Sequence, residues 1–263
     1  MSASWLNPEL DIPLSFTRPA PSTVFVLASA SSGRAGTLRR AGIEPLIRVS
    51  QVDEDAVLAK FEEVSSAEDA AEKVTALAQA KLADVVAGLD ITEILEFAAA
   101  QQMPLPSKVV VVGCDSMLDV AGELVGKPHT PQVAYTRIKQ LSGSRVRLFT
   151  GHAMTLLSVL PVAGATERPQ YRLQVEDTLS QCESTEIEFT HLTDDEITAY
   201  IATGEPLFVA GSFTIDGLGG SFIRGVKGDP HSVVGISLPL LRSLATQLEV
   251  AWPTLWNKAH TVD

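Results

Sequence analysis

A lysine falls on the apolar face of a predicted helix, where its positive charge requires a partner. At helical spacing over residues 67–86, Lys81 shares one stripe with Val74, Ala78, Leu82 and Val85. Burying an ammonium group is costly unless it is paired with an anion or faces a polar cleft. Alternatively, Lys81 extends past the edge of the core into solvent. Lys81 is therefore a candidate functional residue.

An aspartate follows a run of valines. Asp115 comes shortly after Val109–Val112, a continuous apolar run typical of a strand that is buried on both faces. We expect Asp115 at the carboxyl end of that strand, which is where ligands bind in open α/β sheets. A carboxylate there could hold a metal or act as a general base, or it could cap the next segment. The preceding Cys114 should point to the opposite face, into the core.

Small residues form the loop between the first predicted strand, residues 24–28, and a helix that begins near Arg34. The loop consists of Ser29, Ala30, Ser31, Ser32 and Gly33. Free backbone N–H groups at such a helix N-terminus suit a phosphate. An ordinary tight turn has the same composition, so this loop alone decides nothing.

Two further charged residues are candidates, each with a plain alternative. Lys127 lies in the turn GKPHTP, where a lysine is usually just solvated. Glu54 belongs to the acidic stretch VDEDAV, whose carboxylates could hold a cation or form a solvated loop. His152 and His231 have no partner at metal-ligand spacing, so we expect both to be structural.

Predicted strands and helices alternate along the chain, which indicates an α/β fold with a largely parallel or mixed sheet. The predicted strands cover residues 24–28, 108–115, 147–157 and 181–190. The predicted helices cover residues 34–41, 67–86, 131–142, 194–203 and 238–248. Insertions interrupt the pattern near residues 88–107 and 158–170, and the glycine-rich segment 213–235 is predicted to be a hairpin with tight turns.

Residues 23–250 are predicted to form a single domain. Residues 1–22 contain four prolines and show little periodicity, which predicts a poorly ordered extension. Residues 251–263 are expected to form an irregular tail. The chain of 263 residues is long enough for one large domain, or for two lobes that share a cleft.

Composition and charge exclude several classes of protein. A formal net charge of −12 argues against a nucleic-acid binder that works through a broad basic face. The two cysteines, Cys114 and Cys182, form no CxxC pair, so neither a disulfide scaffold nor a zinc site is indicated. No run approaches the roughly 18 apolar residues of a membrane span. We therefore expect no nucleic-acid partner, no membrane association and a cytoplasmic location.

Several short motifs occur in a characteristic order along the chain. They are SASSGR, LRRAGI, VDE, LAQAKLA, GCDSML, GKPHTP, LSGSRVRLFTG, TDDEITAYIATGEP and GDPHSVVGISLPLL. Over residues 24–248 the order of these motifs resembles that of the Maf family of nucleoside triphosphate pyrophosphatases. The motifs GCDSML and FTIDGLGG resemble those of its actinobacterial branch.

The resemblance implies a fold and a reaction. The fold would be the two-lobed α/β fold of Maf and ITPase proteins, with a long mixed central sheet, a cleft between the lobes and a homodimer as the assembly. The reaction would be hydrolysis of a nucleoside triphosphate to the monophosphate and pyrophosphate, aided by Mg²⁺ or Mn²⁺. Asp115 would be the catalytic proton acceptor, and Glu54 and Asp115 would lie at the metal. The implied substrate-binding residues are Ser29, Arg34, Lys81, Lys127 and Asp216.

The sequence departs from the family pattern at two places. The proline and first arginine of the family's SxSPRR loop are Ser32 and Gly33 here, which leaves Arg34 as the only arginine of the pair. The branch that prefers dTTP and UTP has IQG where this chain has Ile215, Asp216 and Gly217. We expect a pyrimidine or a modified nucleotide as substrate, with the base left open by Asp216. The alternative is a nucleotide-binding regulator of cell division and septum formation with weak or no hydrolysis.

Overall fold

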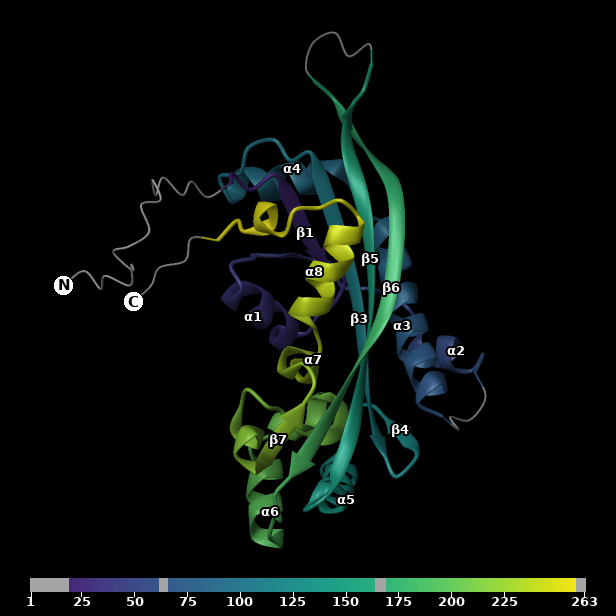
Figure 1. The fold of residues 1–263 in the computed structure, drawn as a ribbon, viewed down its shortest axis with the longest axis vertical. Helices are drawn as coiled ribbons and strands as arrows, with labels where there is room; N and C mark the ends of the chain where they lie inside the picture. The colour runs from purple at the N-terminus through teal and green to yellow at the C-terminus, as the bar shows by residue number, and fades with distance from the viewer. Residues whose placement is uncertain (1–18, 62–65, 164–168, 259–263) are drawn as a thin grey trace, which may run out of the picture.

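One mixed β-sheet extends along the length of the molecule (Figure 1). The structure is a computed structural model that describes residues 19–61, 66–163 and 169–258. In this part of the chain the sheet has seven strands in the order β2-β1-β3-β5-β6-β7, and β4 pairs with β3. β1 is parallel to β2 and β3, whereas the other pairs are antiparallel. The strands are β1 (Thr23–Leu27), β2 (Leu46–Ile47), β3 (Lys108–Val120), β4 (Glu123–Val125), β5 (Arg145–Pro161), β6 (Tyr171–Phe189) and β7 (Ile223–Lys227).

The predicted helices are confirmed, and most begin at a capping side chain. The α-helices are α1 (Ser32–Arg40), α2 (Glu54–Leu58), α3 (Ala67–Ala87), α4 (Ile91–Ala100), α5 (Pro131–Leu141), α6 (Asp194–Ala202), α7 (Pro230–Val234) and α8 (Leu238–Gln247). Short 3-10 helices follow α6 and α8: η1 (Glu205–Phe208), η2 (Ala210–Ser212), η3 (Leu218–Phe222) and η4 (Trp252–Leu255). Thr130 caps α5, and Thr193 forms a capping box of α6 with Glu196.

Helices cover both faces of the sheet at the end that contains β1, because β1 and β3 alternate their side chains between two cores. Val24, Val26, Val109 and Val111 pack with residues of α3 and α4. Their neighbours Phe25, Leu27, Val110 and Val112 pack on the other face with residues of α1 and α8. This double burial explains the continuous apolar runs in the sequence.

The long strands carry the sheet into a second lobe (Figure 1). The second halves of β3 and β6 and the first half of β5 form a separate core there, which includes Leu118, Leu148 and Ile187. The helices α5 and α6 pack on each other through Ile138, Ile197 and Tyr200. Figure 1 shows α5, α6 and β7 at the end of the molecule opposite α4 and β1. The predicted two-lobed α/β fold with a long mixed sheet is confirmed.

Two sequence predictions about local structure are wrong, and one insertion contains a helix that the sequence pattern does not predict. β3 does not end at Asp115 but continues to Val120, because it stays paired with β5 up to Asp119 and then with β4. The glycine-rich segment 213–235 is not a hairpin: it contains η3, β7 and α7, and β7 pairs with β6 instead. The insertion near residues 88–107 contains the helix α4, which begins at the capping residue Asp90.

The predicted extension lies mostly outside the described residues, whereas residues 251–258 of the predicted tail are described and contain η4. Residues 1–18 and 259–263 are not described. Ser22, at the end of the predicted extension, donates its backbone N–H to the carbonyl of Thr254 at 3.1 Å, so the described parts of both termini meet. Within the described chain, none of the helices is both long and apolar enough to cross a lipid bilayer.

Candidate active site

A lysine and two carboxylates meet at the carboxyl half of α3. The Lys81 Nζ atom lies 2.5 Å from Asp115 Oδ1 on β3 and 2.8 Å from Glu54 Oε1 on α2. The side chains of Lys81 and Asp115 are only 12% and 11% exposed, whereas Glu54 is 52% exposed. Lys81 is thus turned inward and paired, so the interpretation that it extends into solvent is wrong. The arrangement is a buried ion pair with one side open to solvent through Glu54.

Two glycines allow α3 to lie directly on the sheet and so bring Lys81 to Asp115. A Cβ atom at Gly151 would lie 2.2 Å from the carbonyl oxygen of Val74, and one at Gly113 would lie 2.3 Å from that of Ala78. Gly151 on β5 is the direct partner of Asp115 in the sheet, and Gly113 is two residues before it on the same face. The absence of both side chains therefore sets the distance between the lysine and the carboxylate.

Burial and nearby cations act in opposite directions on the Asp115 carboxyl. Its burial raises the pKa above the usual range, and the positive charges of Lys81 and Arg34 lower it in part. The pKa remains raised, which makes the ionised carboxylate a stronger base than an exposed aspartate. Cys114 points to the other face as predicted and lies in the core, where burial raises the pKa of its thiol to about 12.

Arg34 joins the loop after β1 to the other side of β3. Its Nη1 donates to Ser29 Oγ at 3.0 Å and to the Cys114 carbonyl at 2.9 Å. Its Nε donates to the Gly235 carbonyl at 2.8 Å, and its Nη2 donates to Ser116 Oγ at 3.3 Å. These four contacts fix the guanidinium beside Cys114 and Ser116, the two neighbours of Asp115 on β3. Ser29 and Arg34, both sequence candidates, are therefore in direct contact.

The loop before α1 has the geometry expected at the N-terminus of a helix. Ser31 is the N-cap of α1, and its hydroxyl accepts a hydrogen bond from the Arg34 N–H at 3.3 Å. Ser29 Oγ accepts from the Ser31 N–H at 3.2 Å. α1 begins five residues after the end of β1, and the N-terminus of a helix is a position at which an anion is favoured.

A buried chain of polar side chains, which the sequence pattern does not reveal, lies behind Arg34. Ser116 Oγ lies 3.0 Å from Thr150 Oγ1, which donates to the Ser232 carbonyl at 3.1 Å. Next to it, His152 Nε2 accepts from the Ser237 N–H at 2.8 Å, so its proton is on Nδ1, 3.0 Å from the Thr150 carbonyl. Spacing in sequence gives no signal for these contacts, because they join four separate elements.

His152 is structural, as predicted from the sequence. Its side chain is fully buried, and burial together with the charge of Arg34 lowers its pKa to about 4. The neutral ring joins β5 to the N-terminus of α8, since Ser237 also caps that helix. His231 contacts Asp229 through Nδ1 at 3.0 Å and is half exposed.

Lys127 and Asp216 lie outside this cluster. Lys127 is exposed, and within the described residues it makes no hydrogen bond or ion pair. Asp216 follows the 3-10 helix η2 and pairs with Arg40 Nη2 on α1 at 3.4 Å. The structure therefore brings together Ser29 with Arg34, and Lys81 with Asp115 and Glu54, but it does not connect Lys127 or Asp216 to either group.

The acidic stretch around Glu54 begins α2 and does not gather its carboxylates. Asp53 caps α2 by accepting from the Ala56 N–H at 3.0 Å, and Glu54 alone of this stretch reaches Lys81. Among the described residues, no three or more histidine, cysteine, aspartate or glutamate side chains group so that they could hold a metal ion. A metal at this site would need ligands beyond Glu54 and Asp115.

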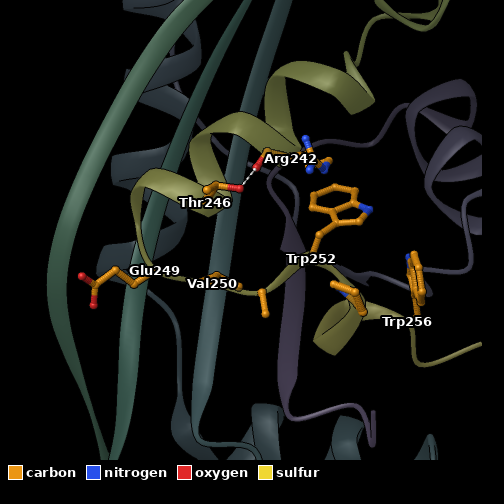
Figure 2. Close-up of a pocket in the computed structure, with 8 residues that line it drawn as sticks. Arg242, Thr246, Glu249, Val250, Trp252 and Trp256 are labelled. Carbon is orange, nitrogen blue, oxygen red and sulfur yellow. Dashed lines mark hydrogen bonds between the residues drawn. The ribbon is translucent and has the colours of Figure 1, made fainter. Parts of the chain in front are cut away.

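A cavity of about 640 Å³ lies elsewhere, between α8 and η4 (Figure 2). Figure 2 shows Trp252, Trp256 and Arg242 on its wall. None of the candidate site residues lines it. The candidate site is therefore defined by its charged side chains and not by this cavity.

Comparisons with known proteins agree with the order of motifs. The sequence profile of the family described as "Maf-like protein" matches residues 24–248. A protein of Saccharopolyspora erythraea is 46% identical over 234 residues, which cover 89% of this chain and 97% of that protein. A protein of Nocardia farcinica is 45% identical over 236 residues, with the same coverage of 89% and 97%. A protein of Rhodococcus jostii is 42% identical over 241 residues, which cover 92% of this chain and 100% of that protein.

All three relatives are named nucleoside triphosphate pyrophosphatase. The profile covers most of the chain, and the identities extend over nearly the full length of each relative. The chain therefore belongs to the Maf-like protein family.

Proposed function

We propose that this protein hydrolyses a nucleoside triphosphate to the nucleoside monophosphate and pyrophosphate. The observation that carries the proposal is the buried pair of Lys81 and Asp115, with Glu54 on its open side and Arg34 on the other side of β3. It places a basic carboxylate among fixed positive charges, which is what attack of water on a polyphosphate requires. The family and the printed names of the relatives support the same reaction.

Asp115 is the proton acceptor in this proposal. Lys81 donates to Oδ1, so we assign the proton of the attacking water to Oδ2. The water oxygen forms a bond to the α-phosphorus, and the bond from that phosphorus to the bridging oxygen of the β-phosphate breaks. The electron pair leaves with pyrophosphate. Burial favours this role, because a carboxyl with a raised pKa takes up a proton more readily.

Arg34 and Lys81 are positioned to bind phosphate oxygens. A guanidinium has five N–H groups, and four hydrogen bonds to Ser29, Cys114, Gly235 and Ser116 use four of them. One N–H of Nη2 remains for a phosphate. Because Gly33 replaces the family's other arginine, Arg34 offers the phosphates only this one donor. The remaining phosphate contacts then come from Lys81 and the N-terminus of α1. Lys127, free at the surface, is proposed as a further phosphate contact.

A divalent cation, Mg²⁺ or Mn²⁺, fits the donor set only together with the substrate. Glu54 and Asp115 supply two carboxylates on either side of the Lys81 ammonium, so the site already accommodates a positive charge between them. Mg²⁺ is typically held by one or two carboxylates plus substrate phosphates and water. Glu54 and Asp115 would hold the ion, which when bound would neutralise part of the charge on the triphosphate.

The substrate class and the assembly are finer proposals. A pyrimidine triphosphate, dTTP or UTP, or a modified nucleotide is supported by the resemblance to the actinobacterial branch, with Asp216 at the position of the branch's glutamine. A carboxylate accepts hydrogen bonds and cannot donate one, so Asp216 selects an N–H edge of the base. The homodimer rests on the same resemblance and stays a prediction, as does the cytoplasmic location.

The test is a product assay across ordinary and modified nucleoside triphosphates with Mg²⁺, Mn²⁺ or no metal. We expect pyrophosphate and monophosphate in equal amounts, with no release of single phosphates. Release of orthophosphate with the diphosphate would contradict attack at the α-phosphorus. Tight nucleotide binding without any product would favour the alternative of a binding regulator.

A further inference from the structure

A single carboxylate organises the segment that carries Asp216. Glu205, at the start of η1, accepts hydrogen bonds from Tyr200 Oη at 3.0 Å and Thr214 Oγ1 at 2.5 Å. It also accepts from the backbone N–H groups of Leu218 and Gly219, each at 3.0 Å. Four donors, from α6, from η3 and from the segment between η2 and η3, thus converge on one side chain. Hydrogen bonds to a charged acceptor are about twice as strong as neutral ones.

The loop of residues 214–219 is wrapped tightly around this carboxylate. A Cβ atom at Gly217 would lie 2.7 Å from Glu205 Oε2, and one at Gly219 would lie 2.5 Å from Tyr200 Oη. Tyr200 is buried and its hydroxyl also accepts from the Thr214 N–H at 3.2 Å. The loop therefore has no packed side chains of its own at these positions, and its shape depends on Glu205.

The ionised form of Glu205 is the one that holds the loop. Partial burial raises its pKa, but the hydrogen bonds from Thr214, Gly219, Leu218 and Tyr200 outweigh that effect and leave the pKa below the usual range. All four partners are donors, so a carboxylate satisfies them without a proton. Near neutral pH the loop is consequently held by a full negative charge.

The loop presents a carboxylate to α1 and exposes an apolar side chain. Asp216 pairs with Arg40 of α1, and Leu218 is 58% exposed although it is a large apolar residue. Arg40 is six residues after Arg34 on the same helix, which corresponds to about 9 Å along the axis. Arg34 and Arg40 therefore lie near opposite ends of α1, so a ligand whose phosphates contact Arg34 would have to extend along this helix to reach Asp216. An apolar surface next to a hydrogen-bonding group is how proteins usually contact a base.

We propose that Glu205 is a positioning residue for nucleoside recognition, and this inference rests on the proposed function. Its carboxylate shapes residues 214–219 so that Asp216 and Leu218 contact the nucleoside half of the substrate. The phosphate half is held separately by Arg34, Lys81 and the N-terminus of α1. Changing Glu205 therefore weakens binding of the nucleoside while binding of the phosphates stays the same.

The test variant is Glu205→Gln, which keeps the size of the side chain but replaces one acceptor oxygen by an NH₂ donor. That NH₂ faces N–H or O–H donors, so at least one of the four hydrogen bonds is lost. The matched control is Glu196→Gln on α6, which removes the same charge from an exposed capping box in the same lobe. Melting temperatures of both variants establish that they are folded.

The measurements are inhibition constants of the two products, dTMP or UMP for the nucleoside half and pyrophosphate for the phosphate half. In Glu205→Gln we expect the constant for the monophosphate to rise about tenfold, the equivalent of one lost charged hydrogen bond, with that for pyrophosphate within about twofold. Glu196→Gln should change neither. Equal weakening of both products, or of neither, would overturn the inference while the wild-type hydrolysis leaves the proposed function standing.

A second variant keeps the test decisive if Glu205→Gln does not fold. Thr214→Val removes one donor and preserves the shape of the side chain, so the fold should survive. It should weaken monophosphate inhibition about threefold without changing pyrophosphate inhibition. A folded Thr214→Val with wild-type constants for both products would contradict the inference. Absence of wild-type hydrolysis would instead overturn the proposed function itself.

Discussion

The close contact of α3 with the sheet can be tested by adding one methyl group. In Gly151→Ala, the new Cβ would lie 2.2 Å from the Val74 carbonyl oxygen and 2.6 Å from the Thr75 backbone nitrogen. Both neighbours are helix backbone, which cannot rotate away as a side chain can. The helix must therefore move away from β5 by about 1 Å to reach an acceptable contact.

The displacement should reduce activity more than stability. Overpacking of this kind costs about 1–3 kcal/mol of unfolding free energy. The same shift moves Lys81, two turns along α3, away from Asp115, and a misplacement of about 1 Å in a catalytic group costs about 10²-fold in rate. We expect a folded protein with a modestly lower melting temperature and a turnover number about 10²-fold below wild type.

The control is Gly225→Ala on β7, where the added Cβ would meet nothing within 4 Å. It repeats the glycine-to-alanine change in a strand without any close neighbour. Turnover and thermal unfolding are measured for wild type and both variants under the same conditions. If Gly151→Ala keeps wild-type turnover, the reasoning that this glycine sets the distance between Lys81 and Asp115 is refuted.

Four further predictions concern charge, metal, base and pH. Lys81→Met should lower turnover at least about 10²-fold. It should also shift the acid limb of the pH–rate profile to higher pH, because removing the ammonium raises the pKa of Asp115 further. An unshifted acid limb would contradict the pairing of Lys81 with Asp115. EDTA should abolish turnover, and Glu54→Gln should raise the Mg²⁺ concentration needed for half-maximal rate; full activity in EDTA would remove the metal from the account. Asp216→Gln should move activity toward dTTP and UTP, and an unchanged ranking of substrates would show that residue 216 does not contact the base. His152 is neutral in the folded state, with its pKa lowered from 6.5 to about 4, so between these two pH values the unfolded chain binds the extra proton. The unfolding free energy should therefore fall by up to about 3 kcal/mol as the pH drops from 6.5 to 4. Urea unfolding of wild type and His152→Gln should show that this part of the pH dependence is absent in the variant.

The sequence alone could predict the residues of the site better than the way they meet. The stripe containing Lys81 and the valines before Asp115 are local patterns, and the structure confirms both as buried. The position of Asp115 within β3 could not be predicted, because continuation of the strand depends on pairing with β5. That pairing joins residues far apart in the chain, which no local period reports.

Glycines explain most of what the sequence left unassigned. Gly113 and Gly151 resemble ordinary strand glycines until the helix lying on them is known. Similarly, the glycine-rich segment 213–235 predicts a hairpin, whereas its Gly217 and Gly219 leave room for Glu205 and Tyr200. A missing side chain indicates a close approach but does not identify the partner. The partner became evident only from the tertiary structure.

The central claim is that Asp115 takes the proton of the attacking water, and Asp115→Asn tests it most directly. The change keeps the size of the side chain and removes its charge and basic oxygen. Melting temperature, nucleotide binding and initial rate are measured at saturating metal for wild type and variant. We predict a folded protein that still binds nucleotide, with turnover lowered about 10²- to 10⁴-fold, the usual contribution of a general base. Near-normal turnover in the folded variant would contradict the account.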